Sequence, residues 1–256
     1  METSLEFGVN KSLNVNKSYH PDVNNSDQPQ QFNADESLET KTRRSLHVIG
    51  ISPEVQEIVF SLLAPLREKS SITHYHYNHS LRVGLICKGI ADYCRLDPKP
   101  LTLAGLLHDL GKVQTNPATL GKTSGWTPAD TEEMKCHVID SYRILRGRLD
   151  FTAEIVVAHH YYQKNGYPSE LPPPLHEYSK ATRILINYLA RMLSLADCYD
   201  ALHRVNDKFG ETRGLTPDEI QSKMMDMNPD QKYLITCLYE GGLFGKEKTA
   251  AKAHQD

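Results

Sequence analysis

The sequence predicts an all-α fold, and three observations support this prediction. From Ser52 onward, apolar residues recur every three or four positions, as they do on one face of a helix. No segment of strand length in this region alternates between apolar and polar residues. Serine or threonine followed by proline, as at Ser52-Pro53 and Thr127-Pro128, is typical of a helix N-terminus. We therefore expect a helical domain without a sheet.

The individual helices follow from the apolar stripes and from the residues that interrupt them. The expected helices cover about residues 53–69, 77–95, 101–110, 128–145, 153–163 and 180–204, and two more begin near Pro217 and Pro229. Gly111 suits the end of the third of these helices, and Pro117 prevents its continuation.

Composition divides the chain into three expected parts. Residues 1–45 are rich in Asn, Ser, Gln, Asp and Lys and have few apolar residues, so we expect a flexible polar leader. Residues 46–245 are expected to form one domain, and residues 246–256 a polar tail.

Charge and cysteine content narrow the function class. Lys plus Arg total 29 against 32 Asp plus Glu, a net charge of -3, so no polymeric nucleic-acid partner is expected. The five cysteines are scattered and form no C-x-x-C pair, as expected of reduced thiols. The N-terminus is acidic, and the most apolar long stretch is interrupted by Arg191, Asp197 and Asp200, so neither a secretory signal nor a membrane partner is expected. A cytoplasmic location follows as an expectation, whereas the oligomeric state is left open.

A group of histidines and aspartates carries the chemistry. One buried histidine is usually a satisfied core residue, but unpaired polar groups on several apolar helix faces are costly. A shared metal centre would remove this cost. The seven candidate metal ligands are His79, His108, Asp109, His137, His159, His160 and Asp197.

The kinds of ligand indicate which ions to expect. Imidazoles and carboxylates without thiolates suit a catalytic centre better than a structural zinc site. Seven ligands exceed the usual protein set of one ion, so we expect two divalent metal ions, iron or manganese before other ions. Two ions bridged by a carboxylate activate a nucleophile and stabilise charge in phosphoester hydrolysis. Asp109, beside a ligand histidine, is the expected bridge.

This pattern resembles the HD superfamily, and within it the HD-GYP phosphodiesterases of cyclic di-GMP, over about residues 74–205. The resemblance rests on the segment 79–83, on HDLGK at 108–112, on His159-His160 followed by Gly166-Tyr167-Pro168, and on Ala196-Asp197 followed by Asp200-Ala201-Leu202. It implies an HD-domain helical bundle with a metal site between core helices. It also implies that one metal takes His79, His108, Asp109 and Asp197, and the other takes Asp109, His137, His159 and His160.

Three further residues receive expected roles. The resemblance implies that Lys112 contacts a substrate phosphate, although a solvated lysine at a helix end is the alternative. Asp200 is expected to orient the attacking water, the alternative being an ordinary carboxylate on a helix face. The Tyr167 ring is expected to hold a nucleobase. The predicted catalytic residues are thus Asp109, Lys112 and Asp200, and the predicted substrate-binding residues are Lys112 and Tyr167.

The chain also departs from the family pattern. Tyr161 replaces the glutamate that usually follows the double histidine, and the loop at 164–165 is one residue short. Residues 206–209 read Asn-Asp-Lys-Phe where the family typically has Arg-Pro-Tyr-Arg. Tyr75 stands where some trinuclear members have a glutamate. His74 and His76 could replace this glutamate as ligands of a third ion, but we expect them to be surface histidines.

The functional expectation is a metal-dependent phosphohydrolase that cleaves a phosphoester in a small nucleotide-like substrate, with a cyclic dinucleotide such as cyclic di-GMP as the first candidate. The same ligands are also similar to those of the HD-type di-iron oxygenases, which is one alternative. A degenerate module that senses a nucleotide without turnover is the other.

Overall fold

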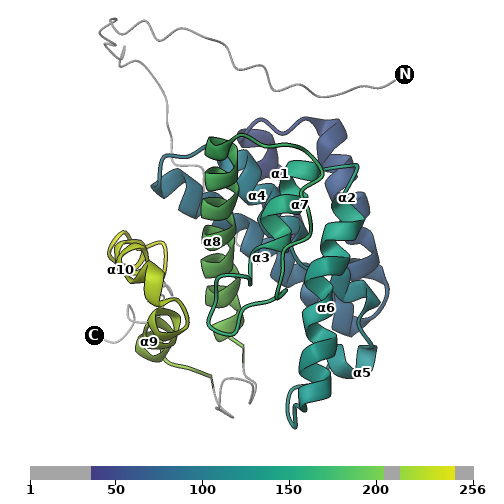
Figure 1. The fold of residues 1–256 in the computed structure, drawn as a ribbon, viewed down its shortest axis with the longest axis vertical. Coiled ribbons are helices and arrows are strands. Elements are labelled where there is room, and N and C mark those ends of the chain that lie inside the picture. The colour runs from purple at the N-terminus through teal and green to yellow at the C-terminus, as the bar shows by residue number, and fades with distance from the viewer. Residues whose placement is uncertain (1–35, 205–213, 246–256) are drawn as a thin grey trace, which may run out of the picture. The chain divides into compact units, whose positions relative to one another are not determined.

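The structure, a computed structural model, describes residues 36–204 and 214–245, and this part of the chain is all-α without a strand (Figure 1). Its α-helices are α1 (Leu38–Val48), α2 (Pro53–Glu68), α3 (Ser71–Tyr93), α4 (Pro98–Leu107), α5 (Pro117–Leu120), α6 (Pro128–Leu145), α7 (Asp150–Val157), α8 (Lys180–Leu202), α9 (Pro217–Met227) and α10 (Lys232–Glu240). Two 3₁₀ helices are η1 (Leu110–Gln114) and η3 (Pro229–Gln231). The all-α prediction is confirmed.

The boundary of the predicted leader is wrong. Helix α1 lies within the last part of the expected leader, where the side chain of Ser37 caps it and Leu46 is fully buried. Glu39 accepts a hydrogen bond from the hydroxyl of Tyr77 on α3 and pairs with Arg43, so this polar helix is held by side-chain contacts rather than by a long apolar stripe. The rest of the leader, residues 1–35, and the predicted tail at 246–256 lie outside the described residues.

Two other boundaries differ from the prediction. Helix α3 begins six residues earlier than expected because Ser70 and Thr73 form a reciprocal capping box ahead of a polar first turn. Helix α7 ends at Val157 instead of continuing to about residue 163, so His159 and His160 lie in the turns that follow it. The short α5 was not predicted.

Helix α3 lies at the centre of the fold and packs against α1, α2, α4 and α8. Helix α4 in turn contacts α7 and α8, while α6 packs on η1 and α7. One continuous apolar core joins helices α3, α4, α6, α7 and α8. Each of them contributes a fully buried side chain, in this order Leu81, Leu106, Val138, Ile155 and Leu193. The C-terminal helix α9 packs against α8. Every helix that carries a predicted ligand, or precedes one, therefore borders the same core.

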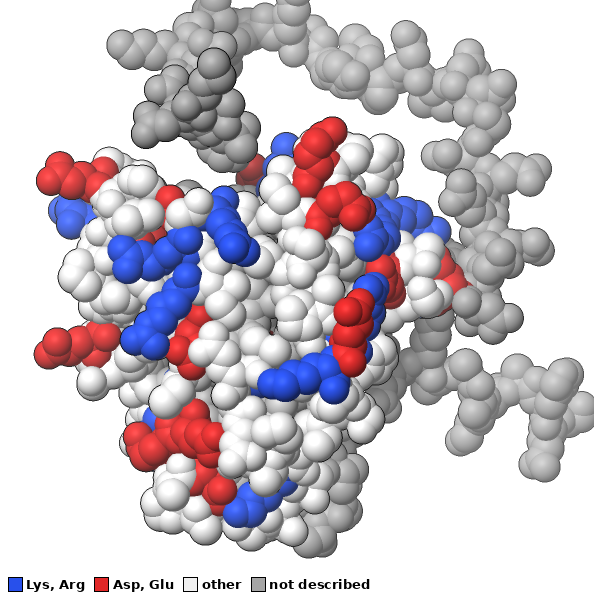
Figure 2. Space-filling view, turned by 90° about the vertical axis from the view of Figure 1, so that its right-hand side faces the viewer, with Lys and Arg blue, Asp and Glu red and all other residues white. Residues whose placement is uncertain are grey.

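The surface carries interspersed charges. On the face shown in Figure 2, lysine and arginine side chains lie beside acidic ones. Lys122 pairs with Asp130 and Lys135 pairs with Glu132, each at 2.6 Å, which is the behaviour of a solvated helix face. Within the described residues, no helix combines the length and the apolar character required to cross a bilayer.

Gly111 sets the distance between η1 and α6. A Cβ atom at this position would lie 2.2 Å from the carbonyl oxygen of His137 and 2.7 Å from the backbone nitrogen of Ser141. The Gly111 nitrogen also donates a hydrogen bond to Ser141 Oγ at 2.8 Å. Glycine is thus required here for close backbone approach rather than for ending a helix, and this approach places Asp109 beside His137.

We expect Gly111→Ala to separate η1 from α6 and to destabilise the protein by about 1–3 kcal/mol or more, as overpacking of a core does. The measurement is the midpoint of thermal unfolding followed by circular dichroism. Gly89→Ala is the matched control, because its added Cβ would meet only the flexible end of the Leu243 side chain. An unchanged midpoint for Gly111→Ala would contradict the proposed close packing.

Candidate metal centre

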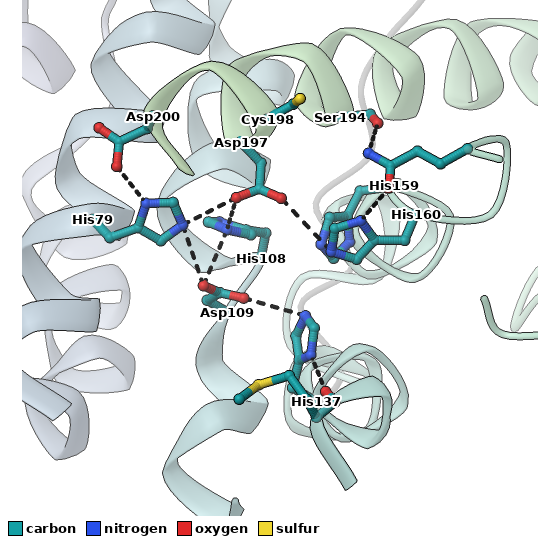
Figure 3. Close-up of polar contacts among 12 residues, drawn as sticks. His79, His108, Asp109, His137, His159, His160, Ser194, Asp197, Cys198 and Asp200 are labelled. Atoms are coloured by element: carbon teal, nitrogen blue, oxygen red, sulfur yellow. Dashed lines mark hydrogen bonds and ion pairs between the residues drawn. The ribbon is translucent and has the colours of Figure 1, made fainter. Parts of the chain in front are cut away.

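The seven predicted ligands come together in the core from five parts of the chain (Figure 3). His79 lies on α3, His108 and Asp109 follow α4, His137 lies on α6, His159 and His160 follow α7, and Asp197 lies on α8. Three groups of these side chains have ligand atoms within 4.8 Å of one another: His79 with His108 and Asp109, His137 with His159 and His160, and His108 with His159 and Asp197. The first two groups share no residue.

The Nδ1 atom of each ligand histidine is held by a hydrogen bond. Three rings use the backbone carbonyl three residues earlier: His108 bonds Gly105 at 2.8 Å, His159 bonds Val156 at 2.6 Å, and His137 bonds Met134. Because a carbonyl oxygen only accepts, these three Nδ1 atoms carry the proton. In the neutral form of each ring, the Nε2 atom is then a bare lone pair directed into the centre.

The remaining two histidines are held by side chains. His79 Nδ1 lies 2.6 Å from Asp200 Oδ2, and His160 Nδ1 lies 3.0 Å from Gln163 Oε1. Gln163 itself donates to Ser194 Oγ on α8 at 2.8 Å, which continues the chain of hydrogen bonds seen in Figure 3. All five imidazoles therefore have a fixed orientation.

Four of the five inward Nε2 atoms are buried and have no hydrogen-bond partner, namely those of His79, His108, His137 and His159. Their nearest polar neighbours are carboxylate oxygens, for example Asp197 Oδ1 at 3.1 Å from His79 Nε2. A lone pair facing a carboxylate in a buried place is repulsive unless a cation or a proton lies between them. The donor set therefore fits metal ions, because imidazole nitrogen and carboxylate oxygen are common ligands of catalytic ions.

Protonation of the histidines would pair only some of the buried acceptor atoms of this centre. Burial opposes the charged form of His108, but Asp109 and Asp197 outweigh it and raise the pKa of His108 to about 10. Burial lowers the pKa of His137 to about 3 and that of His159 to about 4, with a further contribution at His159 from the charge of His108. These two rings are neutral at pH 7, which is the form that binds a metal ion.

Both carboxylates reach two groups of histidines. Asp109 Oδ2 lies 3.4 Å from His79 Nε2 and 3.3 Å from His108 Nε2, while its Oδ1 lies 3.3 Å from His137 Nε2. This placement fits the bridging position expected for Asp109. Asp197 also spans the centre, since its Oδ1 faces His79 while its Oδ2 lies 3.6 Å from His160 Nε2. The family resemblance implied a contact of Asp197 with one group only.

The carboxylates stay ionised although they are buried. Burial alone would raise the pKa of Asp109, but the charges of His108 and Lys112 lower this pKa well below its usual value. Burial would also raise the pKa of Asp197, but the neighbouring imidazoles of His108 and His79 lower it well below its usual value. The centre thus offers two carboxylate charges to a cation.

Lys112 and Asp200 lie beside the centre and line a common cavity of about 640 Å³. Lys112 is buried, and its Nζ lies 2.6 Å from Asp109 Oδ2, so it is not the solvated lysine of the alternative interpretation. Asp200 directs Oδ2 to His79 and binds Arg82 with both oxygens, at 2.6 and 3.0 Å. Its immediate contacts therefore orient a ligand histidine, and an additional role in orienting water stays a prediction.

Tyr167 lies on the wall of the same cavity. Its ring centroid is 4.5 Å from that of His160 and 6.2 Å from that of His137. The preceding Gly166 packs on the backbone, where a Cβ would lie 2.2 Å from the carbonyl oxygen of Tyr161. The short loop therefore still brings the tyrosine ring to the centre, although a nucleobase contact is not tested by this placement.

The interpretation of His76 as a surface residue is wrong. Its side chain is 5% exposed and lines the cavity, because it follows the buried Thr73 by one turn of α3. His74, by contrast, is exposed as expected. Burial and the charge of Lys112 lower the pKa of His76 to about 2.

Sequence reasoning missed Gln163 and the contact between Arg82 and Asp200. The signal for each was spacing, since Gln163 follows His160 by three residues and Arg82 follows His79 by three. Cys198, next to the ligand Asp197, is 4% exposed, points away from the centre in Figure 3 and lies near Asn228, so it fills space in the core. The departure at 206–209 lies outside the described residues.

We expect Asp200→Asn to weaken metal binding by about 10- to 100-fold, because residues that orient a ligand histidine typically contribute that much to affinity. Calorimetric titration of the metal-free protein with Mn²⁺ measures this effect. Asp92→Asn is the matched control, since Asp92 pairs only with Lys88 at the surface. Equal Mn²⁺ affinity in both variants would show that the contact with His79 does not matter.

Comparison with known proteins agrees with this site. Residues 76–202 match the family model of the HD domain. The chain is 31% identical to the cyclic di-GMP phosphodiesterase PA4108 of Pseudomonas aeruginosa over 160 residues, which are 59% of this chain and 36% of that protein. It is 42% identical to ribonuclease Y of Pelobacter propionicus over 67 residues, which are 26% of this chain and 12% of that protein.

The chain thus spans well under half the length of these curated relatives. Among solved structures, the HD domain of the L. monocytogenes phosphodiesterase PgpH superposes with a TM-score of 0.46 at 16% identity, over 70% of this chain and 87% of that one. The family match covers the ligand positions from His79 to Asp197, and they lie together in the fold. Residues 76–202 of this chain therefore form a domain of the HD-domain family.

Proposed function

We propose that this chain is a metal-dependent phosphohydrolase that cleaves a phosphoester in a small nucleotide-like molecule. The observation that carries the proposal is the set of buried, partnerless Nε2 atoms facing Asp109 and Asp197. His137 from this set, together with Asp197, also lines a cavity large enough for a nucleotide-sized ligand.

Two divalent ions, iron or manganese before others, fit this centre. His79, His108 and Asp109 would hold one ion, and His137, His159 and His160 would hold the other. Asp109 and Asp197 reach both groups and would connect them. When bound, such ions polarise phosphoryl oxygens and lower the pKa of water, so that a nucleophile forms at neutral pH.

The protein's own groups complete the site. Lys112 places a positive charge beside Asp109 on the cavity wall, where it suits a phosphate oxygen whose negative charge increases during the reaction. Asp200 fixes the ring of His79, and the buried walls around the centre keep bulk water away from it. Tyr167 offers an aromatic face next to His160 on which a nucleobase can stack.

The relatives support the reaction class more strongly than the substrate. PA4108 is named for a cyclic dinucleotide and ribonuclease Y for RNA, and both substrates are joined by phosphodiester bonds. The 59% of this chain that aligns with PA4108, together with the absence of an overall positive charge, makes a cyclic dinucleotide the first candidate.

One experiment distinguishes this proposal from the two alternatives, a di-iron oxygenase and a module that senses a nucleotide without turnover. The purified chain is supplied with Mn²⁺ under argon and assayed with bis(p-nitrophenyl) phosphate and cyclic di-GMP. Hydrolysis under these conditions excludes an oxygenase for that substrate, since no dioxygen is present. Tight binding of cyclic di-GMP without turnover of either compound would favour the sensing module instead.

Asp109→Ala should lose both metal content and hydrolysis, because both groups of histidines lose the carboxylate that faces them. Metal content is measured by mass spectrometry of the purified protein, and folding is checked by circular dichroism. Asp92→Ala, which removes the partner of Lys88 at the surface, is the control. Hydrolysis retained by a folded Asp109→Ala variant would refute the mechanism.

Lys112→Gln should reduce kcat by about 100-fold or more, as loss of a group that stabilises developing charge does, while the metal content stays near that of the wild type. Lys122→Gln is the matched control, since Lys122 lines the same cavity but pairs with Asp130. A reduction that is equal in the two variants would show that Lys112 has no special role. Parallel loss of metal would instead mean that Lys112 acts by holding Asp109.

A further inference from the structure

Arg191 lies on α8, the helix that carries the ligand Asp197, and its side chain is buried with 7% exposed. Its Nε and Nη2 atoms donate to the two carboxylate oxygens of Asp230, at 3.1 and 2.7 Å, and Nη2 also lies 3.4 Å from Asn228 Oδ1. The remaining nitrogen, Nη1, donates to Ser194 Oγ at 3.2 Å. Each nitrogen of this guanidinium therefore has an acceptor, which holds the side chain in one geometry.

Ser194 connects Arg191 with the turns that follow α7. It is fully buried, and its Oγ accepts a second hydrogen bond, from Gln163 Nε2 at 2.8 Å (Figure 3). Because the amide nitrogen of Gln163 is directed to Ser194, its Oε1 faces His160 Nδ1, at 3.0 Å. An amide oxygen only accepts, so His160 Nδ1 carries the proton, and in the neutral ring Nε2 is the atom left for a metal ion.

The support of His160 differs from that of the other ligand histidines. Three of the other rings are held by the backbone carbonyl three residues earlier, and His79 is held directly by the carboxylate of Asp200. His160 depends instead on a network of side-chain hydrogen bonds that runs through α8 to Asp230 in η3. A residue distant from the centre can therefore influence this one ring.

We propose that Arg191 is a positioning residue of the metal centre, one that fixes the ring of His160 through this hydrogen-bond network. None of the three side chains of the network, Arg191, Ser194 and Gln163, lines the cavity beside the centre. Their influence therefore acts through His160 and not through contact with a substrate. The inference rests on the proposed function, in which His160 holds one of two ions, and it makes that ion depend on the contact with Asp230 beyond α9.

Calorimetric titration of the metal-free full chain with Mn²⁺ tests this role. Arg191→Met replaces the guanidinium by an apolar side chain and should weaken the binding of one Mn²⁺ ion by about 10-fold, the lower end of the range for groups that orient a ligand histidine. The other ion should keep its affinity, because the group of His79, His108 and Asp109 is held by other contacts. Ser194→Ala removes a single hydroxyl from the network and should have the same effect, so it decides the question if Arg191→Met does not fold.

A double-mutant comparison distinguishes this role from a general effect on stability. Gln163→Met breaks the network next to His160 and should weaken the same ion by at least as much. In the Gln163→Met background, Arg191→Met should change the affinity by less than about twofold, since effects of residues in one hydrogen-bond network do not add. Equal losses of affinity in both backgrounds would mean that Arg191 does not act through Gln163, and would overturn the proposal.

Two control variants complete the experiment. Arg183→Met changes an exposed arginine on the same helix and should leave the affinity for both ions unchanged. Ile220→Ala removes a buried side chain near the other end of α9 and should lower the thermal unfolding midpoint without changing Mn²⁺ affinity. If Ile220→Ala weakens the same ion as much as Arg191→Met does, the effect arises from packing and the proposal is refuted.

The outcomes for Arg191 and for the proposed function are distinct. Wild-type affinity for both ions in a folded Arg191→Met variant overturns the role of Arg191 and leaves the hydrolase intact. If wild type binds two Mn²⁺ ions but hydrolyses neither bis(p-nitrophenyl) phosphate nor cyclic di-GMP, the proposed function fails, and the Mn²⁺ affinities still decide the role of Arg191. Absence of Mn²⁺ binding by wild type overturns both.

Discussion

The centre of this protein holds hydrogen-bond acceptors that face one another, an arrangement that requires positive charge between them. Imidazole lone pairs and carboxylate oxygens, both acceptors, face one another at 3.1–3.6 Å in a buried space. In most folded proteins buried polar atoms have partners within the protein, and here the Nδ1 side of each ring does. The unpaired atoms are confined to the inward side. Because only the inward atoms are unpaired, they indicate a binding site and not a packing defect.

The helix termini and turns hold these facing acceptors in position. His108 and His159 lie just beyond α4 and α7, and each ring is fixed by the carbonyl three residues earlier in the chain. These carbonyls are near the C-termini of their helices, where backbone acceptors lack partners within the helix. The same bond therefore gives a carbonyl at the helix end a side-chain donor and sets the direction of a ligand. On the other side, the close approach at Gly111 brings η1 against α6, so that Asp109 and His137 meet.

The sequence could predict which residues meet, but not how they are held. His79, His137 and Asp197 lie on apolar helix stripes, so periodicity was sufficient to direct them to the core. The double contact of Asp197 and the hydrogen bond from His160 to Gln163 depend on rotamers and on the early end of α7, which periodicity does not encode. His76 was misjudged for a related reason. Its neighbours in sequence are polar, and its burial arises from the wall of the cavity and not from an apolar stripe.

The cavity wall and the metal centre are linked through charged side chains. Arg82 on the wall binds Asp200 with two hydrogen bonds, and Asp200 in turn fixes the ring of His79. A change at Arg82 or Asp200 therefore reaches a ligand ring. Lys112 instead contacts Asp109, a carboxylate that the Nε2 atoms of three histidines also face, so the position of Asp109 depends on several contacts and not on Lys112 alone.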